Sequence, residues 1–144
     1  MALAVLERRV PPAWVDWNEH MSAACFALAF AEANDQALAG LGFDAGYRQR
    51  AGCACYVVEA LYRYRRELRL GDALRIETWL SHVDAKRLRL GHVMTQASGA
   101  RAAEAEILFL HVAWRQRRVV PFEADLQRRL EALVTPGAAS GEAS

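Results

Sequence analysis

The densest group of chemically active side chains lies in a nine-residue stretch, WVDWNEHMS, at positions 14–22. Asp16 carries a carboxylate, a group that can remove a proton from water or attack an electrophilic carbon directly. Trp14 and Trp17 flank it, and apolar neighbours that exclude water make a carboxylate more basic. We therefore take Asp16 as the first candidate catalytic residue. Asn18 is a candidate to orient water or substrate, or alternatively to stabilise the loop.

A predicted helix begins directly after this stretch. Ser22 is a suitable N-cap residue, and aromatic or small apolar residues then recur at helical spacing. These are Phe26, Phe30, Ala33, Ala37 and Leu41. Small and apolar residues fill the other faces as well, which is typical of a helix enclosed by the rest of its protein. Because the first N–H groups of a helix are unpaired and stabilise negative charge, we expect an oxyanion site at His20, Met21 and Ser22.

The remainder of the chain alternates apolar and polar residues in the pattern of β-strands. The expected strands cover residues 3–10, 56–68, 74–80, 88–94 and 101–116, and a short amphipathic helix covers 121–133. Tight turns separate the long strands, so we expect an antiparallel meander. One helix with such a sheet is an α+β architecture. We assign a single domain to residues 1–134 and a disordered tail to residues 135–144.

A single sheet around one helix leaves an open edge and often a bare face. Both features favour association with a second copy of the chain. We therefore expect a homo-oligomer, either a dimer or a tetramer.

Composition and charge exclude several classes of protein. The 144 residues carry a formal net charge of +1, which gives no reason to expect nucleic acid or a membrane surface as a partner. The longest apolar run, 23–31, is too short to span a bilayer. The N-terminus has no signal-peptide pattern, and the three cysteines form neither a disulfide nor a metal framework. We expect a cytoplasmic protein without metal or cofactor.

The motif D-W-N-E-H-M-S, followed by A-F-A-E-A, resembles the signature of hot-dog-fold thioesterases of the 4-hydroxybenzoyl-CoA thioesterase type. That family carries D-x-x-G-H-[VM]-N before a helix with an aromatic-acid-acid-alanine pattern. The matching residues here are Asp16, His20, Met21, Phe30, Glu32 and Ala33. The resemblance implies hydrolysis of an acyl-CoA thioester at a site between subunits. It implies that Asp16 activates water or attacks directly, while the helix N-terminus polarises the thioester carbonyl.

Further motifs are similar to a narrower group, the betainyl-CoA thioesterases associated with carnitine dehydrogenase. They are V-V-E-A-L-Y-R-Y-R-R-E-L-R-L-G-D at 57–72, D-A-K-R-L at 84–88 and F-L-H-V at 109–112. The similarity implies betainyl-CoA as substrate and a functional association with carnitine dehydrogenase. Two positions depart from the family pattern. Glu19 stands where the family has a glycine, and in the family this glycine lets the backbone approach the thioester. Ser22 stands where the family has an asparagine.

A betainyl group carries a trimethylammonium, which aromatic rings bind by cation–π attraction. The candidate cage residues are Trp14, Trp17, Phe26 and Tyr56, with Tyr47 as a further possibility, although aromatic residues at such positions equally well pack a core. Arg87 and Arg89, two residues apart on one strand, are candidates to bind the CoA phosphates.

Glu59 lies among apolar strand residues and is a second candidate acid. Two carboxylates at one site can divide the acid and base roles, so Glu59 of one subunit could face Asp16 of the other. The alternative is an ion pair with Arg63 or Arg65 of its own strand.

Other polar residues are expected to have structural roles. Glu32 on the helix is costly to bury unpaired, so we expect an arginine of the sheet to pair with it. His92 and His111 are expected to be hydrogen-bonded core histidines. His20 could hold the loop or contact substrate.

Two other functions remain open at this stage. Hot-dog enoyl-CoA hydratases resemble D-x-N-P-x-H, and D-W-N-E-H has the acid, amide and imidazole but lacks the proline and one residue of spacing. Alternatively, a domain with Glu19 in place of glycine could bind an acyl-CoA or acyl carrier without turning it over.

Overall fold

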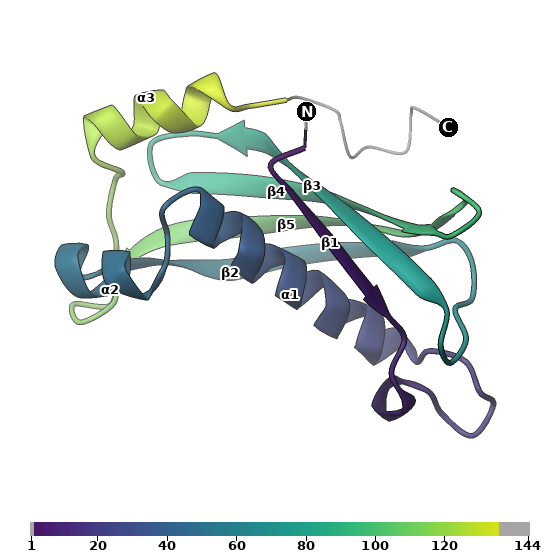
Figure 1. Ribbon diagram of the computed structural model, residues 1–144. Coiled ribbons are helices and arrows are strands. Elements are labelled where there is room, and N and C mark those ends of the chain that lie inside the picture. Colours follow the sequence, from purple (N-terminus) through teal and green to yellow (C-terminus); the bar gives the residue numbers. More distant parts are fainter. Residues whose placement is uncertain (1, 136–144) are drawn as a thin grey trace.

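The longest helix, α1 (Ala23–Gly40), lies along one face of an antiparallel sheet (Figure 1). The computed structural model describes residues 2–135 of the chain. The buried residues of α1 include Phe26, Phe30 and Ala37, at the predicted helical spacing. Its opposite face is exposed, with Leu28 at 52%. Within one chain the helix is therefore covered on one side only, and the prediction of an enclosed helix is wrong for the isolated chain.

The sheet has six strands in the order β1-β3-β4-β5-β2, and β6 pairs with β5. The strands are β1 (Ala4–Arg9), β2 (Cys53–Tyr64), β3 (Ala73–Val83), β4 (Arg87–Gln96), β5 (Arg101–Ala113) and β6 (Arg118–Val119). In β3 the residues Leu74, Ile76, Thr78 and Leu80 are buried and their neighbours are more exposed. This alternation follows from the pleat of a strand with one face on the core.

The predicted meander is correct for β3, β4 and β5 but wrong for β2. β2 pairs with β5 over its whole length, so it forms one edge of the sheet, and β1 forms the other. The predicted Leu-Gly-Asp turn is present, but it binds the end of β1: the Gly71 N–H donates to the Val10 carbonyl, and the Val10 N–H to the Asp72 carbonyl. Alternation assigns residues to a strand without specifying its neighbours, because that choice depends on long-range packing.

Three short helices complete the fold: η1 (Pro12–Trp14), α2 (Ala45–Ala51) and α3 (Ala124–Ala132). Only α3 was predicted, and it buries Leu126 and Leu130 as its pattern required. The Asp44 carboxylate caps α2 by accepting the Tyr47 N–H at 2.8 Å. Of the tail predicted to be disordered, Thr135 donates its N–H to the Leu80 carbonyl, and residues 136–144 lie outside the described residues.

The two predicted core histidines are confirmed. His92 is fully buried, with Nε2 2.7 Å from Asn34 Oδ1 of α1 and Nδ1 2.8 Å from Thr78 Oγ1 of β3. Burial lowers the pKa of His92 to about 3, so the ring is neutral and its two nitrogens act as one donor and one acceptor.

His111 has the same kind of environment at the other end of the sheet. Its Nδ1 lies 3.0 Å from the Val120 carbonyl oxygen, and the Tyr47 hydroxyl lies 2.7 Å from its Nε2. Burial lowers the pKa of His111 and raises the pKa of Tyr47 to about 12. Both side chains therefore remain neutral at neutral pH.

Across the described residues, none of the helices has the length and apolar character that crossing a bilayer requires.

Candidate active site

The stretch before α1 folds into a small hairpin. Val15 and Met21 form an antiparallel bridge, the Asp16 N–H donates to the His20 carbonyl, and the Glu19 N–H donates to the Asp16 carbonyl at 2.9 Å. The Asp16 carboxylate accepts the Asn18 N–H at 2.9 Å, a contact that stabilises the turn. Glu19 has φ 66°, the left-handed conformation that glycine adopts without strain. Glu19 thus keeps the backbone geometry that a glycine would favour at this position.

Trp14 anchors one side of this hairpin. Its side chain is only 8% exposed, and the Arg8 guanidinium stacks 4.0 Å from the centre of its ring. Arg8 also pairs with Glu32 of α1, which confirms that an arginine of the sheet neutralises this acid. The Ser22 N–H donates to the Trp14 carbonyl at 3.0 Å. These contacts tie β1, the hairpin and α1 together.

The other side of the hairpin is held by the segment after β2. The Met21 N–H donates to the Leu68 carbonyl at 2.7 Å, and His20 forms a bridge with Arg69. The His20 imidazole lies 3.4 Å from the Glu67 carboxylate, so it is engaged with Glu67. This orientation supports a loop-holding role for His20, and it does not provide the shared Asp–His water of a hydratase.

The unpaired N–H groups at the start of α1 belong to Ala23 and Ala24, which directly follow the residues predicted to supply them. The Met21 and Ser22 amides donate within the fold, so neither is free to bind a substrate oxygen. The Ser22 carbonyl accepts from Cys25 and Phe26, whereas the Ala23 and Ala24 amides have no partner among residues 2–135. Both alanines are exposed. Of the amides predicted for the oxyanion site, those of Met21 and Ser22 are thus engaged within the fold, and the donors that helix geometry leaves open are those of Ala23 and Ala24.

A pocket of about 310 Å³ opens beside this helix start. It is lined by Met21, Ala23, Phe26, Tyr64, Arg65, Arg66 and Glu67. The Phe26 and Tyr64 rings meet edge to face, with their centres 5.3 Å apart. Of the predicted cage residues, Phe26 is thus the one that lines the pocket.

Arg65 is held at the pocket by Glu104 of β5. Its Nη2 lies 3.1 Å from the Glu104 carboxylate, which Arg101 also contacts. Burial alone would raise the pKa of Glu104, but the hydrogen bonds from Arg65 and Arg101 outweigh burial and hold that pKa below its ordinary value. Arg65 therefore pairs with Glu104 and not with Glu59.

Asp16 lies at the turn of the hairpin, and its side chain is exposed, as is that of Asn18. Trp17 is 90% exposed and does not cover the carboxylate, while Trp14 packs beneath Arg8. The expectation that the two tryptophans desolvate Asp16 is therefore wrong for a single chain. A covering surface for Asp16 would have to come from substrate or from a second subunit.

The chain by itself does not bring β2 residues Glu59 and Tyr56 to the hairpin. Tyr62 stacks on Phe30 of α1, so alternation along the strand turns Glu59 to the opposite face of the sheet. Glu59 forms no ion pair with residues 2–135. At about 3.3 Å per residue, Tyr56 lies roughly 25 Å along β2 from Tyr64 at the pocket.

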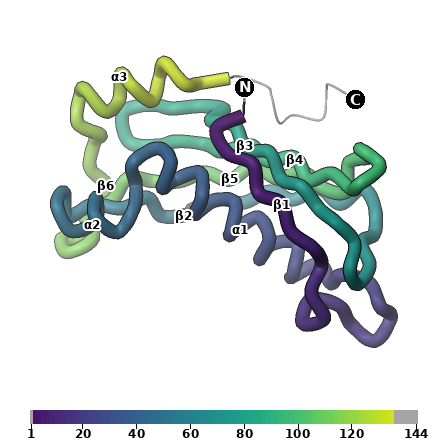
Figure 2. The backbone as a smooth tube through the Cα atoms, in the orientation of Figure 1, coloured from purple at the N-terminus to yellow at the C-terminus, as the bar shows by residue number. Residues whose placement is uncertain are grey.

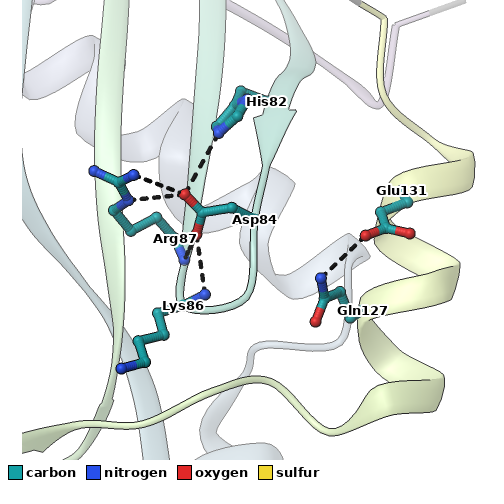
Figure 3. Close-up of polar contacts among 6 residues, drawn as sticks. All are labelled: His82, Asp84, Lys86, Arg87, Gln127 and Glu131. Carbon is teal, nitrogen blue, oxygen red and sulfur yellow. Dashed lines mark hydrogen bonds and ion pairs between the residues drawn. The ribbon is translucent and has the colours of Figure 1, made fainter.

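Arg87 and Arg89 also lie far from the hairpin of their own chain. Arg87 pairs with Asp84 in the turn between β3 and β4, where the Asp84 carboxylate also accepts the Lys86 N–H (Figure 3). The run from Arg87 to Met94, which is level with the pocket end of the sheet, measures roughly 23 Å. Asp84 already neutralises Arg87, and a role in binding CoA phosphates stays a prediction for both Arg87 and Arg89.

Three residues that build the site were not singled out from the sequence as such: Arg8, Tyr64 and Glu67. Arg8 stabilises the hairpin through a stacking contact that depends on tertiary structure. Tyr64 and Glu67 precede the Leu-Gly-Asp turn, which pairs with Val10 at the end of β1, shortly before the hairpin.

Comparison with known proteins gives matches over nearly the whole chain. A family model described as the thioesterase-like superfamily matches residues 10–130. The L-carnitine dehydrogenase/betainyl-CoA thioesterase of Agrobacterium fabrum is 37% identical over 131 residues, covering 91% of this chain and 27% of that protein. The betainyl-CoA thioesterase of Pseudomonas aeruginosa is 33% identical over 132 residues, covering 91% of this chain and 83% of that protein. The chain thus spans about a quarter of the first relative and most of the second.

Solved structures show the same fold. A Staphylococcus aureus protein in complex with CoA matches with a TM-score of 0.83 and 23% identity, covering 89% of this chain and 80% of that one. A 1,4-dihydroxy-2-naphthoyl-CoA thioesterase from Synechocystis matches with a TM-score of 0.77 and 22% identity, covering 92% and 98%. Together with the family match, these likenesses confirm the predicted hot-dog fold.

Proposed function

The chain belongs to the thioesterase-like superfamily, and from that premise we propose that it hydrolyses acyl-CoA thioesters at the hairpin before α1. The observation that carries the proposal is the arrangement at the helix start. The Asp16 hairpin leads directly into α1, whose Ala23 and Ala24 amides have no partner among the described residues, and a pocket lined by Ala23 opens at this helix start. A carboxylate and free helix amides are the two kinds of group that acyl transfer to water requires.

In the proposed reaction the thioester carbonyl oxygen accepts hydrogen bonds from the Ala23 and Ala24 N–H groups. Asp16 removes a proton from a water molecule as that water attacks the carbonyl carbon. The C–S bond then breaks, and the CoA thiolate takes the proton from Asp16. In the alternative route Asp16 attacks the carbon itself, CoA thiolate leaves, and water hydrolyses the resulting anhydride. One well-placed oxyanion donor contributes about 10²–10³ in kcat.

We further propose that a homodimer formed through β2 completes this site. β2 is an edge strand with a row of exposed apolar residues: Tyr56, Val57, Val58, Leu61 and Tyr64. Exposed apolar residues on a long edge strand favour pairing with another strand. Antiparallel pairing of two β2 strands would set the start of one beside the end of the other. The partner subunit's Tyr56 would then lie near the Phe26 and Tyr64 rings.

The proposed acyl group of the substrate is the betainyl group. The relatives from Agrobacterium and Pseudomonas are named betainyl-CoA thioesterases. Phe26, Tyr64 and the partner subunit's Tyr56 together would give aromatic faces for a trimethylammonium group. Trp14 contributes to loop stability instead, because Arg8 occupies its ring.

The Agrobacterium relative carries both activities in its name, L-carnitine dehydrogenase and betainyl-CoA thioesterase. We propose a functional association of this chain with such a dehydrogenase, in the cytoplasm. The free thiols of Cys25, Cys53 and Cys55 are consistent with a reducing compartment.

The test is thiol release from a panel containing betainyl-CoA, short straight-chain acyl-CoA and aryl-CoA. We expect turnover of betainyl-CoA, and at least a hundredfold loss of kcat in Asp16→Ala and Asp16→Asn with the oligomer intact. Asp35→Asn, which changes an exposed acid on α1, is the matched control and should retain activity. Turnover of other thioesters alone would remove the betainyl assignment.

Near wild-type activity in both Asp16 variants would overturn the catalytic role of Asp16. CoA binding without turnover of any thioester would replace the hydrolase by a non-catalytic acyl-CoA-binding domain.

A further inference from the structure

A second pocket, of about 590 Å³, lies at the end of the sheet opposite the start of α1. It is formed between α2 and the turn that joins β5 to β6, which lie side by side (Figure 2). The charged residues of its lining are Arg50, Arg115 and Arg118, and it contains no acidic residue. A concave surface with this composition is suited to an anion.

The positive charge at this pocket is not neutralised by the fold. None of the three arginines that line it forms an ion pair with residues 2–135, and the same holds for Arg48 and Arg117 on the adjoining segments. The nearby acid Asp44 uses its carboxylate to cap α2. Planar guanidinium groups bind phosphate oxygens in a bidentate manner, so three of them without an ion pair in one pocket favour a phosphorylated ligand.

Trp114 fixes the two halves of the pocket relative to each other. Its indole N–H donates to the Arg48 carbonyl at 3.3 Å, and its backbone N–H donates to the Gly52 carbonyl at 3.1 Å. The Arg48 guanidinium stacks 3.9 Å from the centre of its ring, and the Arg115 guanidinium lies 4.8 Å away. These contacts restrict the Arg48 and Arg115 side chains, which reduces the entropy lost when a ligand binds.

The position of this pocket on β2 connects it to the proposed active site. Cys53, at the start of β2, lines the basic pocket, and Tyr64, at its end, lines the pocket beside α1. Antiparallel pairing of two β2 strands brings the start of one strand beside the end of the other. The basic pocket of one subunit would then adjoin the Asp16 hairpin of its partner.

We propose that the arginines of α2 and the β5–β6 turn bind the phosphate groups at the nucleotide end of CoA, while the thioester lies at the helix start of the partner subunit. The proposal rests on the proposed thioesterase function and names the residues that hold its substrate. It also explains why Arg87, which Asp84 neutralises, is not needed for this role.

The kinetic test compares an acyl-CoA with the same acyl group on pantetheine, which lacks the nucleotide. In the double variant Arg115→Ala/Arg118→Ala we expect KM for acyl-CoA to rise about tenfold, equivalent to about 1.4 kcal/mol. The change for the pantetheine thioester should be several-fold smaller.

Replacement by lysine at both positions should restore part of the affinity, since lysine keeps the charge without the bidentate geometry. Arg129→Ala, on the surface of α3, is the control. An unchanged KM for acyl-CoA in the double alanine variant overturns the proposal.

A binding measurement separates this inference from the proposed function. Titration calorimetry with CoA itself requires no turnover, and binding should weaken about tenfold in the double alanine variant. Competition by adenosine 3′,5′-bisphosphate for acyl-CoA would support a CoA site. ATP that binds at these arginines without inhibiting acyl-CoA turnover would instead assign the pocket to a free nucleotide and overturn the CoA assignment. Arginine-dependent CoA binding in a protein that hydrolyses no thioester would leave this inference standing while the proposed function fails.

Discussion

The hairpin before α1 depends on the backbone conformation of Glu19. With φ at 66°, this residue occupies a region in which a Cβ atom is strained and glycine is not. The strain is confined to a turn that otherwise has favourable chemistry, because the Asp16 carboxylate accepts the Asn18 N–H. Glu19 thus costs the chain stability while leaving the direction of the loop unchanged.

We predict that Glu19→Gly is more stable than Glu19→Ala by about 1 kcal/mol, because only the alanine retains the left-handed strain. Urea unfolding of the two variants measures the difference. The same pair of substitutions at Arg117, which has φ 55°, is an independent check and should give the same order. Equal stability of the glycine and alanine variants at Glu19 would show that the turn has a different conformation in solution.

For individual side chains, the sequence predicted the polar partners of Glu32 and His92 correctly, but it did not predict which groups of the hairpin are exposed or unpaired. It anticipated that a sheet arginine would pair with Glu32 and that His92 would be a satisfied core histidine. It placed the free amides one step too early, because the Met21 and Ser22 amides pair with Leu68 and Trp14, carbonyls brought close only by folding. The exposure of Asp16 was missed for the same reason.

Three elements of the core are joined by one buried network. His92 of β4 bonds to Asn34 of α1 and to Thr78 of β3, and burial holds its pKa at about 3. In the unfolded chain a histidine has a pKa near 6.5. Between these two values the unfolded state binds more protons than the folded state, so the free energy of unfolding falls as the pH falls.

We predict that lowering the pH from 7 to 5 reduces the free energy of unfolding by about 2 kcal/mol through His92 alone. Denaturant unfolding at several pH values measures this slope. His92→Gln should remove this contribution, leave the smaller one of His111, whose pKa burial also lowers, and decrease the free energy of unfolding at pH 7 by about 1–3 kcal/mol through the lost hydrogen bond. His82→Gln changes a half-exposed histidine and should retain the slope. A slope in His92→Gln as steep as that of the unchanged protein would contradict the assignment of His92 as a buried neutral residue.

Element prediction succeeded where the local pattern was strong. The helical spacing of Phe26, Phe30 and Ala33 predicted α1, and alternation predicted β3 and β4 within a few residues. The seven-residue helix α2 was missed because it buries none of its residues and so has no apolar periodicity. The pairing of β2 with β5 was missed because strand neighbours are chosen by the whole sheet.

At the level of the molecule, the exposed edge of β2 and the bare face of α1 are the features that a single chain leaves incomplete. Both proposals depend on the β2 edge: a second subunit would provide cover for Asp16, and it would bring the basic pocket to the active site. The sequence predicted an oligomer from the same reasoning about edges, but it assigned the edge to no particular strand. The strand order identifies β2 and β1 as the two edges.

We predict that Leu61→Lys converts a dimer to a monomer and removes thioesterase activity, because the added charge is placed among the exposed apolar residues of the β2 edge. Sedimentation velocity measures the oligomeric state, and thiol release measures activity on the same samples. Val5→Lys is the matched control, since Val5 is an exposed apolar residue on the other edge strand, β1. A dimer that persists in Leu61→Lys but dissociates in Val5→Lys would move the interface to β1 and separate the basic pocket from the partner's helix start. Loss of the dimer with full activity retained would place the complete active site within one chain.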